Sequence, residues 1–328
     1  MSPRRIVVAT HGHCFDGMAS AALFAHLIRK VRGGTPLELR YLSCGYGPNM
    51  SQIPAFWLTG DENAILDFRY TASKRVSWYF DHHATGFGSE QEREAALAGA
   101  SRSPDEGPQV YHDAAYGSCT RLIADTAERV YGVETAAQSE LVRWADRIDT
   151  ASFDSAADAI RRDEPVLQLA SVVEQHGDRA FLDAIVPMLE QRELADVARD
   201  PWIQQLWAPI ATAQAALVER VRASSKRVGR VVVTDLSSAP VETPAKFMSY
   251  ALFPECMYSV TLSRTKQHYK LAVGYNPWCG AARLHDIASI CKRYGGGGHP
   301  VVGAATFRLP DEPLARAATE EIARQLAA

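Results

Sequence analysis

Three consecutive residues with metal-binding side chains, Asp81-His82-His83, follow a short apolar run at residues 76–80. A carboxylate and two imidazoles are ligands that proteins commonly offer to divalent ions. A strand that ends here would fix the backbone, while the loop after it would leave the side chains open. The tripeptide alone is equally consistent with an ordinary polar loop after a strand. The hypothesis of a metal site therefore needs support from other residues.

Side chains of the same kinds follow two further apolar runs, at residues 6–10 and 64–66. These side chains are His11, His13, Cys14, Asp16 and Asp67. Because the carboxyl ends of parallel strands meet at one edge of a sheet, we expect them to lie close to the tripeptide. Together they predict one metal-binding constellation.

One more carboxylate stands at a predicted helix end. Residues 136–148 have the pattern of a helix, with Asp146 and Asp149 at its C-terminus. Negative charge there opposes the helix macrodipole and is costly unless a cation lies nearby. Asp149 is therefore a candidate for a further metal ligand of the site.

The N-terminal elements predict an α/β fold with a parallel sheet. Apolar runs at residues 6–10, 64–66 and 76–80 indicate buried strands, residues 37–42 are a further strand candidate, and residues 18–31 indicate a helix. The polar stretch from residue 84 to 108 predicts a surface excursion. Ser118 and Gly132 would begin and end a helix that we interpret as capped and without chemistry.

The middle of the chain, from residue 164 to about 225, predicts helices throughout, with no residues that suggest chemistry. We expect breaks at Gly177, Pro187, Pro201 and Pro209. The last of these helices, at residues 210–225, is a connector between domains or a core helix of the first domain.

The composition changes at Arg230 and predicts a smaller α+β domain. Strands are expected at residues 231–236, 258–264, 268–275 and 301–307, and helices at 244–252 and 284–294. Four glycines and His299 lie between the last helix and the last strand. Such a run is either a hinge or an anion site, and the histidine favours phosphate binding.

Length and composition predict two domains and narrow the range of ligands. The 328 residues are 47% hydrophobic, and the formal net charge is -3. A protein that grips long double-stranded nucleic acid would carry a positive field, so a short anionic substrate fits better. We expect no secretory leader, no membrane span and no membrane partner. The six scattered cysteines, without a CxxC pair, favour the cytoplasm and no disulfides.

These motifs, taken in order, resemble the DHH phosphoesterase superfamily, in its arrangement with a DHH-associated C-terminal domain. The matching segments are HGHCFDGMAS at 11–20, Asp67, the tripeptide at 81–83, DTASF at 149–153 and GGGGH at 295–299. The resemblance implies a catalytic domain at 1–195, a helical linker at 196–228 and a substrate-binding domain at 229–328. Relatives include oligoribonucleases that degrade very short RNA, 3′-phosphoadenosine 5′-phosphate phosphatases, cyclic-dinucleotide phosphodiesterases, RecJ-like exonucleases and pyrophosphatases. Dimers are common among them, which leaves a homodimer open.

The resemblance also implies two divalent ions, usually manganese, and a role for each motif residue. Asp67 would be shared by both ions, with His11 and Cys14 on one and Asp16, His82 and Asp149 on the other. His83 would act on the substrate as a catalytic residue, and Asp81 would orient a histidine. The residues that would hold the distal part of the substrate are Gly296, Gly297, Gly298 and His299.

Two positions depart from the family pattern. Cys14 stands where the family has an aspartate, and a thiolate favours zinc over manganese or magnesium. Spacing leaves open whether His13 or Asp146 joins the site. In the C-terminal domain, Tyr275-Asn276-Pro277 replaces the arginine and serine that often contact substrate.

The sequence thus predicts a metal-dependent phosphodiesterase or phosphatase that acts on short oligonucleotides or small nucleotides. The chain has no long basic or aromatic-rich tract along which a polymer could run. The alternative is a catalytically weakened DHH-fold protein that binds and senses a nucleotide, which the loss of an aspartate at Cys14 would explain.

Overall fold

The computed structural model describes residues 2–46, 52–101, 103–241 and 247–328, which form two compact units. Unit 1 comprises the described residues up to Ser152 together with Asp163–Trp207, and unit 2 comprises Phe153–Arg162 with Ala208–Ala328. The predicted limits place residues 153–162 in the first domain. They lie in unit 2 instead, where Ala156 packs against Val232 and Tyr250.

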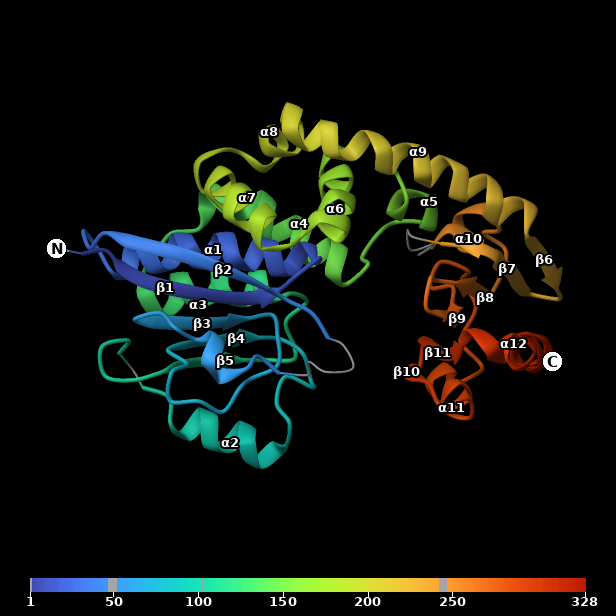
Figure 1. Ribbon diagram of the computed structural model, residues 1–328, viewed down its shortest axis with the longest axis horizontal. Coiled ribbons are helices and arrows are strands. Elements are labelled where there is room, and N and C mark those ends of the chain that lie inside the picture. Colours follow the sequence, from blue (N-terminus) through green and yellow to red (C-terminus); the bar gives the residue numbers. More distant parts are fainter. Residues whose placement is uncertain (1, 47–51, 102, 242–246) are drawn as a thin grey trace. The chain divides into compact units, whose positions relative to one another are not determined.

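Unit 1 is an α/β unit whose N-terminal half contains the predicted strands (Figure 1). Its elements are β1 (Arg4–His11), α1 (Phe15–Val31), β2 (Leu37–Cys44), η1 (Ala55–Trp57), β3 (Glu62–Leu66), β4 (Trp78–Asp81), α2 (Glu90–Ala98), β5 (Gln109–His112), α3 (Cys119–Tyr131), η2 (Ala136–Gln138), α4 (Ser139–Asp149), α6 (Pro165–His176), α7 (Arg179–Gln191) and α8 (Leu194–Ala198). The last helix, α9 (Pro201–Ala223), begins in unit 1 and ends in unit 2.

The sheet of unit 1 is parallel, with strand order β2-β1-β3-β4-β5. Every residue of β3 and β4 is buried, as expected for strands covered on both faces. The chain reverses its direction of winding beside β1, whose neighbours are β2 and β3. The carboxyl ends of β1 and β3 therefore mark the switch point at which such sheets bind ligands.

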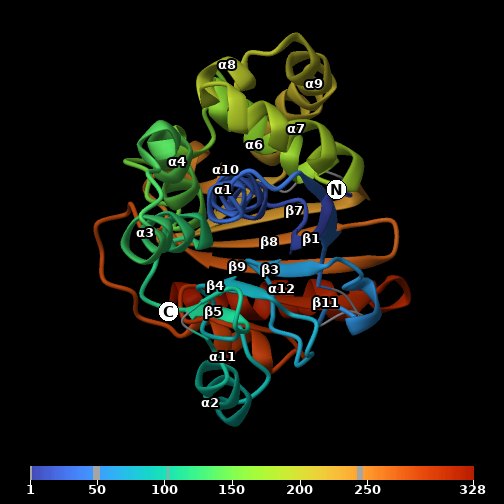
Figure 2. The same ribbon diagram turned by 90° about the vertical axis from the view of Figure 1, so that its left-hand side faces the viewer.

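Side chains alternate between the two faces of β4. Trp78 and Phe80 point toward α1, where their rings lie 5.7 and 6.3 Å from that of Phe24. Tyr79 points to the other face and packs against Phe87 in a core that also contacts α2. Figure 2 shows α1 and α3 on one face of this sheet and α2 on the other.

Unit 2 has a mixed sheet, with strand order β10-β11-β9-β8-β7-β6. Its elements are α5 (Ala156–Ala159), β6 (Ser225–Val228), β7 (Val231–Pro240), α10 (Met248–Leu252), β8 (Tyr258–Arg264), β9 (His268–Tyr275), α11 (Ile287–Lys292), β10 (Gly297–His299), β11 (Val302–Arg308), η3 (Leu309–Asp311) and α12 (Glu312–Ala327). The helix α12 covers the sheet with Ala315, Ile322 and Leu326, which join the core formed by Val260 and Leu271.

Helix positions differ from the sequence prediction in five places. Pro187 and Pro209 lie inside α7 and α9, so the breaks predicted there are wrong. In α9 the buried stripe continues across Pro209 through Ile203, Ile210 and Leu217, and this packing offsets the hydrogen bond that proline removes. The helix predicted at 284–294 is limited to α11. The helices α2 and α12 and the strand β5 were not predicted.

No helix among the described residues combines the length and the apolar character needed to cross a bilayer. All six cysteines are free thiols.

Candidate metal centre

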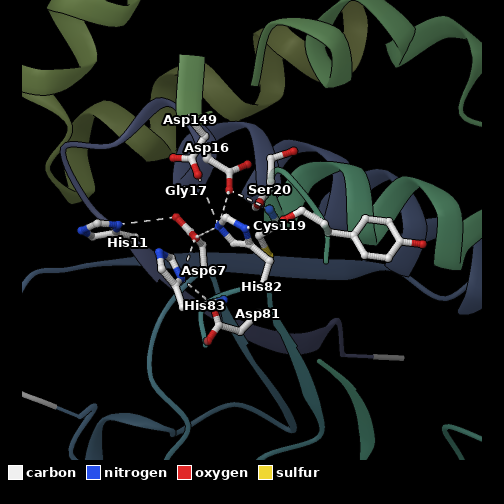
Figure 3. A network of polar contacts seen from close by, with 12 residues as sticks. His11, Asp16, Gly17, Ser20, Asp67, Asp81, His82, His83, Cys119 and Asp149 are labelled. Carbon is white, nitrogen blue, oxygen red and sulfur yellow. Dashed lines mark hydrogen bonds and ion pairs between the residues drawn. The ribbon is translucent and has the colours of Figure 1, made fainter. Parts of the chain in front are cut away.

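The candidate site lies at the carboxyl ends of three neighbouring strands of unit 1. His11 is the last residue of β1, Asp67 follows β3 directly, and Asp81 ends β4 and is followed by His82 and His83. In Figure 3 the labelled imidazoles and carboxylates from these strand ends point toward one another. The structure thus brings together residues that the sequence predicted from strand ends alone.

A close contact between β1 and α1 shapes the first turn of the site. A Cβ atom on Gly17 would lie only 2.0 Å from the carbonyl oxygen of His11, so glycine is required where the helix meets the strand end. Between them, His13 adopts a positive φ of 55° and donates its N–H to the carbonyl of Gly177 at 3.2 Å. This tight turn places Cys14 at the start of α1, beside His11.

Asp67 is the central carboxylate. Its backbone has a positive φ of 53°, and its N–H donates to the carbonyl of Phe80 at 2.9 Å. The residue is only 1% exposed, yet neither carboxylate oxygen has a hydrogen-bond partner. The nearest nitrogens belong to His11 at 3.5 Å and to His82 and His83, both at 3.6 Å. Buried oxygens without partners are costly, and a cation between these groups would satisfy them.

His82 points a third unpartnered atom into the same space. Its Nδ1 donates to the carbonyl of Tyr116 at 3.1 Å, which leaves Nε2 as the free nitrogen. Three carboxylate oxygens surround Nε2, from Asp149 at 3.4 Å, Asp67 at 3.6 Å and Asp16 at 3.7 Å. Nε2 is buried and makes no hydrogen bond. A histidine held at one nitrogen by a carbonyl is typical of a metal ligand.

The N-terminus of α3 holds Asp16 in place. The N–H groups of Cys119 and Thr120 donate to the two carboxylate oxygens of Asp16 at 2.7 and 3.0 Å, and the Thr120 hydroxyl adds a bond of 2.5 Å. These donors belong to the first turn of the helix, whose positive end favours the carboxylate. The sequence pattern of α3 predicted a capped helix alone, without this contact. Ser118 caps the helix as predicted.

Because several carboxylates lie close together, the pKa values of the site are shifted when no cation is bound. Burial and the carboxylates of Asp67 and Asp149 raise the pKa of Asp16 to about 8. Burial and Asp67 also raise the pKa of Asp149. Burial also disfavours the charged forms of His82 and Asp67, but the contacts between histidines and carboxylates have the larger effect. The neighbouring carboxylates raise the pKa of His82 to about 9. The neighbouring histidines lower the pKa of Asp67. A bound cation would relieve the repulsion among the carboxylates.

The residues present fit divalent metal ions. Three groups have ligand atoms that all lie within 4.8 Å of one another: His11, Cys14 and Asp67; Asp67, His82 and His83; and Asp16, His82 and Asp149. Asp67 belongs to two of these groups. Burial and the Asp67 carboxylate raise the pKa of the Cys14 thiol well above its usual value, which a cation would reverse.

His83 is oriented by a chain of buried groups. Its Nδ1 lies 2.8 Å from Oδ1 of Asp81, whose Oδ2 accepts a hydrogen bond from the hydroxyl of Tyr79 at 2.9 Å. A Cβ atom on Gly86 would lie 2.1 Å from that same Oδ2. His112 contacts the carbonyl of His83 through Nε2 at 2.8 Å. The resemblance implied that Asp81 orients a histidine. The contributions of Tyr79, Gly86 and His112 were not predicted, since ordinary strands and turns carry the same residues.

The sequence matches no protein-family model and no curated protein sequence. Solved structures are similar over almost the whole chain. The pGpG-specific phosphodiesterase PggH from Vibrio cholerae has a TM-score of 0.67 at 16% identity, covering 98% of this chain and 99% of that one. The DHH domain of a member of the s1p family of ribosomal proteins has a TM-score of 0.57 at 12% identity, covering 99% of this chain and 88% of that one. This chain has the DHH fold.

RecJ from Thermus thermophilus, in complex with Mn²⁺, has a TM-score of 0.59 at 12% identity. The match covers 98% of this chain and 52% of RecJ, so this chain spans about half the length of that protein. The resemblance drawn from the motifs is thereby confirmed at the level of the fold.

Within this DHH fold, neither residue that the sequence analysis left open belongs to the three ligand groups. The Nδ1 atom of His13 lies 3.2 Å from the carbonyl of Glu174. Asp146 accepts hydrogen bonds from the Ser118 hydroxyl at 2.7 Å and from Arg121 at 3.4 Å, so it supports the start of α3.

The glycine run of unit 2 forms β10 and the turn before it. A Cβ atom on Gly296 would lie 2.0 Å from the carbonyl oxygen of Ala304, which shows how closely this segment approaches β11. Gly298 has a φ of 144°, and His299 is exposed. Close strand pairing therefore accounts for part of this run, and phosphate binding there stays a prediction. Asn276 is buried and donates to the carbonyls of Pro254 and Cys256, which is a structural role.

Proposed function

We propose that this chain is a metal-dependent phosphoesterase that hydrolyses short oligonucleotides or small phosphorylated nucleotides. The observation that carries the proposal is the set of buried atoms without partners on Asp67 and His82, beside the carboxylates of Asp16 and Asp149. Two divalent ions, with manganese as the first choice, would activate a water molecule and neutralise charge on the phosphate. The chain supplies the ligands, excludes bulk water through burial and positions a proton donor.

Each residue has a proposed role that follows its contacts. Asp67 would serve both ions; His11 and Cys14 would hold one, and Asp16, His82 and Asp149 would hold the other. The α3 N-terminus keeps the Asp16 carboxylate in place, and the Tyr116 carbonyl fixes the tautomer of His82. These supports reduce the freedom of the ligands before an ion binds.

His83 is the proposed catalytic residue on the substrate side. Its Nδ1 is engaged by Asp81, so Nε2 is free to face a phosphate oxygen or the leaving group. The hydrogen bond that His83 donates to the Asp81 carboxylate raises the pKa of His83 against the opposing effect of burial. A raised pKa favours the protonated imidazole, which could donate its proton to the departing oxygen.

Two observations support a small nucleotide as the substrate. The net charge of -3 disfavours a polymer held through its phosphates. The similar PggH acts on pGpG, as its name states, and RecJ has the same fold. The backbone of Gly296, Gly297 and Gly298 and the exposed His299 would hold a terminal phosphate in unit 2.

Six free thiols are consistent with a cytoplasmic enzyme.

A hydrolysis screen tests the proposal. The protein is incubated with Mn²⁺ and with linear di- to pentanucleotides, cyclic dinucleotides, bisphosphorylated adenosine and pyrophosphate. We expect release of mononucleotides or phosphate from at least one of them. Asp67→Asn, at the end of β3, should abolish this release, whereas Asp61→Asn, just before the start of the same strand, should preserve it. Metal-loaded protein without turnover on any substrate would contradict the enzyme and, with tight nucleotide binding, would favour the sensing protein.

A further inference from the structure

We propose that the two metal positions differ in ion preference: His11, Cys14 and Asp67 select a thiophilic ion such as zinc, whereas Asp16, His82 and Asp149 take a harder ion such as manganese. This inference deepens the proposed function, because it specifies which ion each half of the same centre would hold. It concerns the donor atoms of this chain and is tested by binding as well as by turnover.

The position of Cys14 makes its sulfur available as a ligand. Cys14 is the N-cap residue of α1, with extended backbone angles and no side-chain capping hydrogen bond. A serine or aspartate would serve better as a cap, so capping does not account for a cysteine here. The positive end of the α1 macrodipole favours negative charge at this position.

A second observation points to a ligand beside Cys14. Its sulfur lies within 4.8 Å of a ligand atom of His11 and of Asp67. Asp67 is 1% exposed, and both of its oxygens lack hydrogen-bond partners although they are buried among these groups. Three different donor atoms therefore converge where a buried carboxylate remains unsatisfied.

The donor atoms of the two positions differ in chemical softness. Sulfur, imidazole nitrogen and one carboxylate form a set that suits zinc, whereas two carboxylates and one imidazole suit manganese or magnesium. Of the six cysteines, all of which are described, Cys14 alone belongs to a group of possible ligands. Cys44, Cys119, Cys256 and Cys291 are buried, and Cys279 is partly exposed in unit 2.

Cobalt titration tests whether sulfur binds the ion. Metal-depleted, reduced protein is titrated with Co²⁺, which replaces zinc, and the near-ultraviolet sulfur-to-cobalt charge-transfer band is recorded. Bound zinc and manganese are then measured after dialysis against both ions together. We expect the band, and we expect about one zinc and one manganese for each chain. Cys14→Ser should lose the band and lower the affinity for zinc by at least about 10-fold. Substituting residues that only hydrogen-bond to metal ligands already lowers metal affinity by about 10- to 100-fold.

Cys14→Asp should also lose the band and bind manganese at both positions. Cys279→Ser, the same substitution at a cysteine of similar exposure, should change neither the band nor the metal content. Circular dichroism of each variant shows whether it folds. If Cys14→Asp does not fold, the more conservative Cys14→Ser alone tests the proposal.

The proposal is overturned if Co²⁺ binds without the band, if the band survives Cys14→Ser, or if zinc and manganese bind both positions equally. These outcomes are separate from failure of the proposed function. A protein that hydrolyses nucleotides with manganese but shows no thiolate band contradicts the ion preference alone. A protein with the band and the mixed metal content but no turnover contradicts the phosphoesterase alone.

Discussion

The hydroxyl of Tyr79 offers a sharp test of how this site is held, because a Tyr79→Phe substitution removes one oxygen and little volume. That hydroxyl donates to Oδ2 of Asp81 at 2.9 Å and also lies 3.0 Å from the carbonyl of Gly86. Asp81 is fully buried, and its other oxygen contacts His83. The substitution therefore takes a donor from a buried carboxylate that orients the proposed catalytic histidine.

The magnitude follows from the lost hydrogen bond. A bond to a charged group contributes about 1.5–3 kcal/mol, and a buried acceptor left without its donor adds part of its desolvation cost. We expect Tyr79→Phe to lower the free energy of unfolding by about 2–3 kcal/mol, which corresponds to roughly 4–12 °C in melting temperature for a unit of this size. Turnover should fall about 10-fold, as expected when a group behind an active residue is removed. Bound metal should not change.

Thermal melting, metal analysis and kcat measurement on the same preparations check this prediction. Tyr70→Phe is the matched control, since Tyr70 packs against Tyr79 in the same aromatic core and its hydroxyl has no hydrogen-bond partner among the described residues. It should change stability by less than about 0.5 kcal/mol. If Tyr79→Phe loses stability but keeps full turnover, Tyr79 does not position the histidine. If both variants behave alike, the hydrogen bond itself is without consequence.

Three other perturbations separate the remaining roles. His82→Ala should lose metal and turnover together, whereas His83→Ala should keep most of the metal and lose at least about 100-fold in turnover; equal metal loss in both would contradict the division of roles. With a chelator present, the melting temperature should fall between pH 6.5 and 9, because the folded protein binds more protons than the unfolded chain at Asp16, with pKa about 8, and at His82, with pKa about 9. Added Mn²⁺ should flatten this fall, and a flat profile in the chelated protein would contradict the assigned protonation. Gly17→Ala would place a Cβ atom 2.0 Å from a backbone carbonyl at the end of β1 and should weaken metal binding measured by calorimetry, while Gly33→Ala, whose Cβ atom meets nothing closer than 3.6 Å, should not.

The sequence predicted those parts of the site that depend on local order. His11, Asp67 and the tripeptide each follow an apolar run, and a parallel sheet places such ends at one edge. The support for Asp16 could not be predicted in this way, because its donors in α3 are 103 and 104 residues away along the chain. A capped helix has the same sequence pattern whether or not its first N–H groups bind a distant carboxylate.

Local patterns also misled where tertiary packing decided the outcome. Proline predicts a break, yet the buried stripe from Ile203 to Leu217 carries α9 across Pro209. The glycine run of unit 2 predicted a hinge or an anion site; the pairing of Gly297–His299 with β11 argues against the hinge. In both cases burial or strand pairing outweighs the conformational preference of a single residue.

Electrostatics distinguish a metal centre from a structural cluster of ion pairs. A structural cluster satisfies each buried carboxylate with donors, as the start of α3 does for Asp16. Even with those donors, burial and the neighbouring carboxylates keep the pKa of Asp16 at about 8, so helix N–H groups alone do not offset the accumulated charge. Asp67 has no donor on either oxygen, and one histidine faces three carboxylates. This imbalance is removed by added positive charge at the switch point of the sheet, which is what divalent ions would supply.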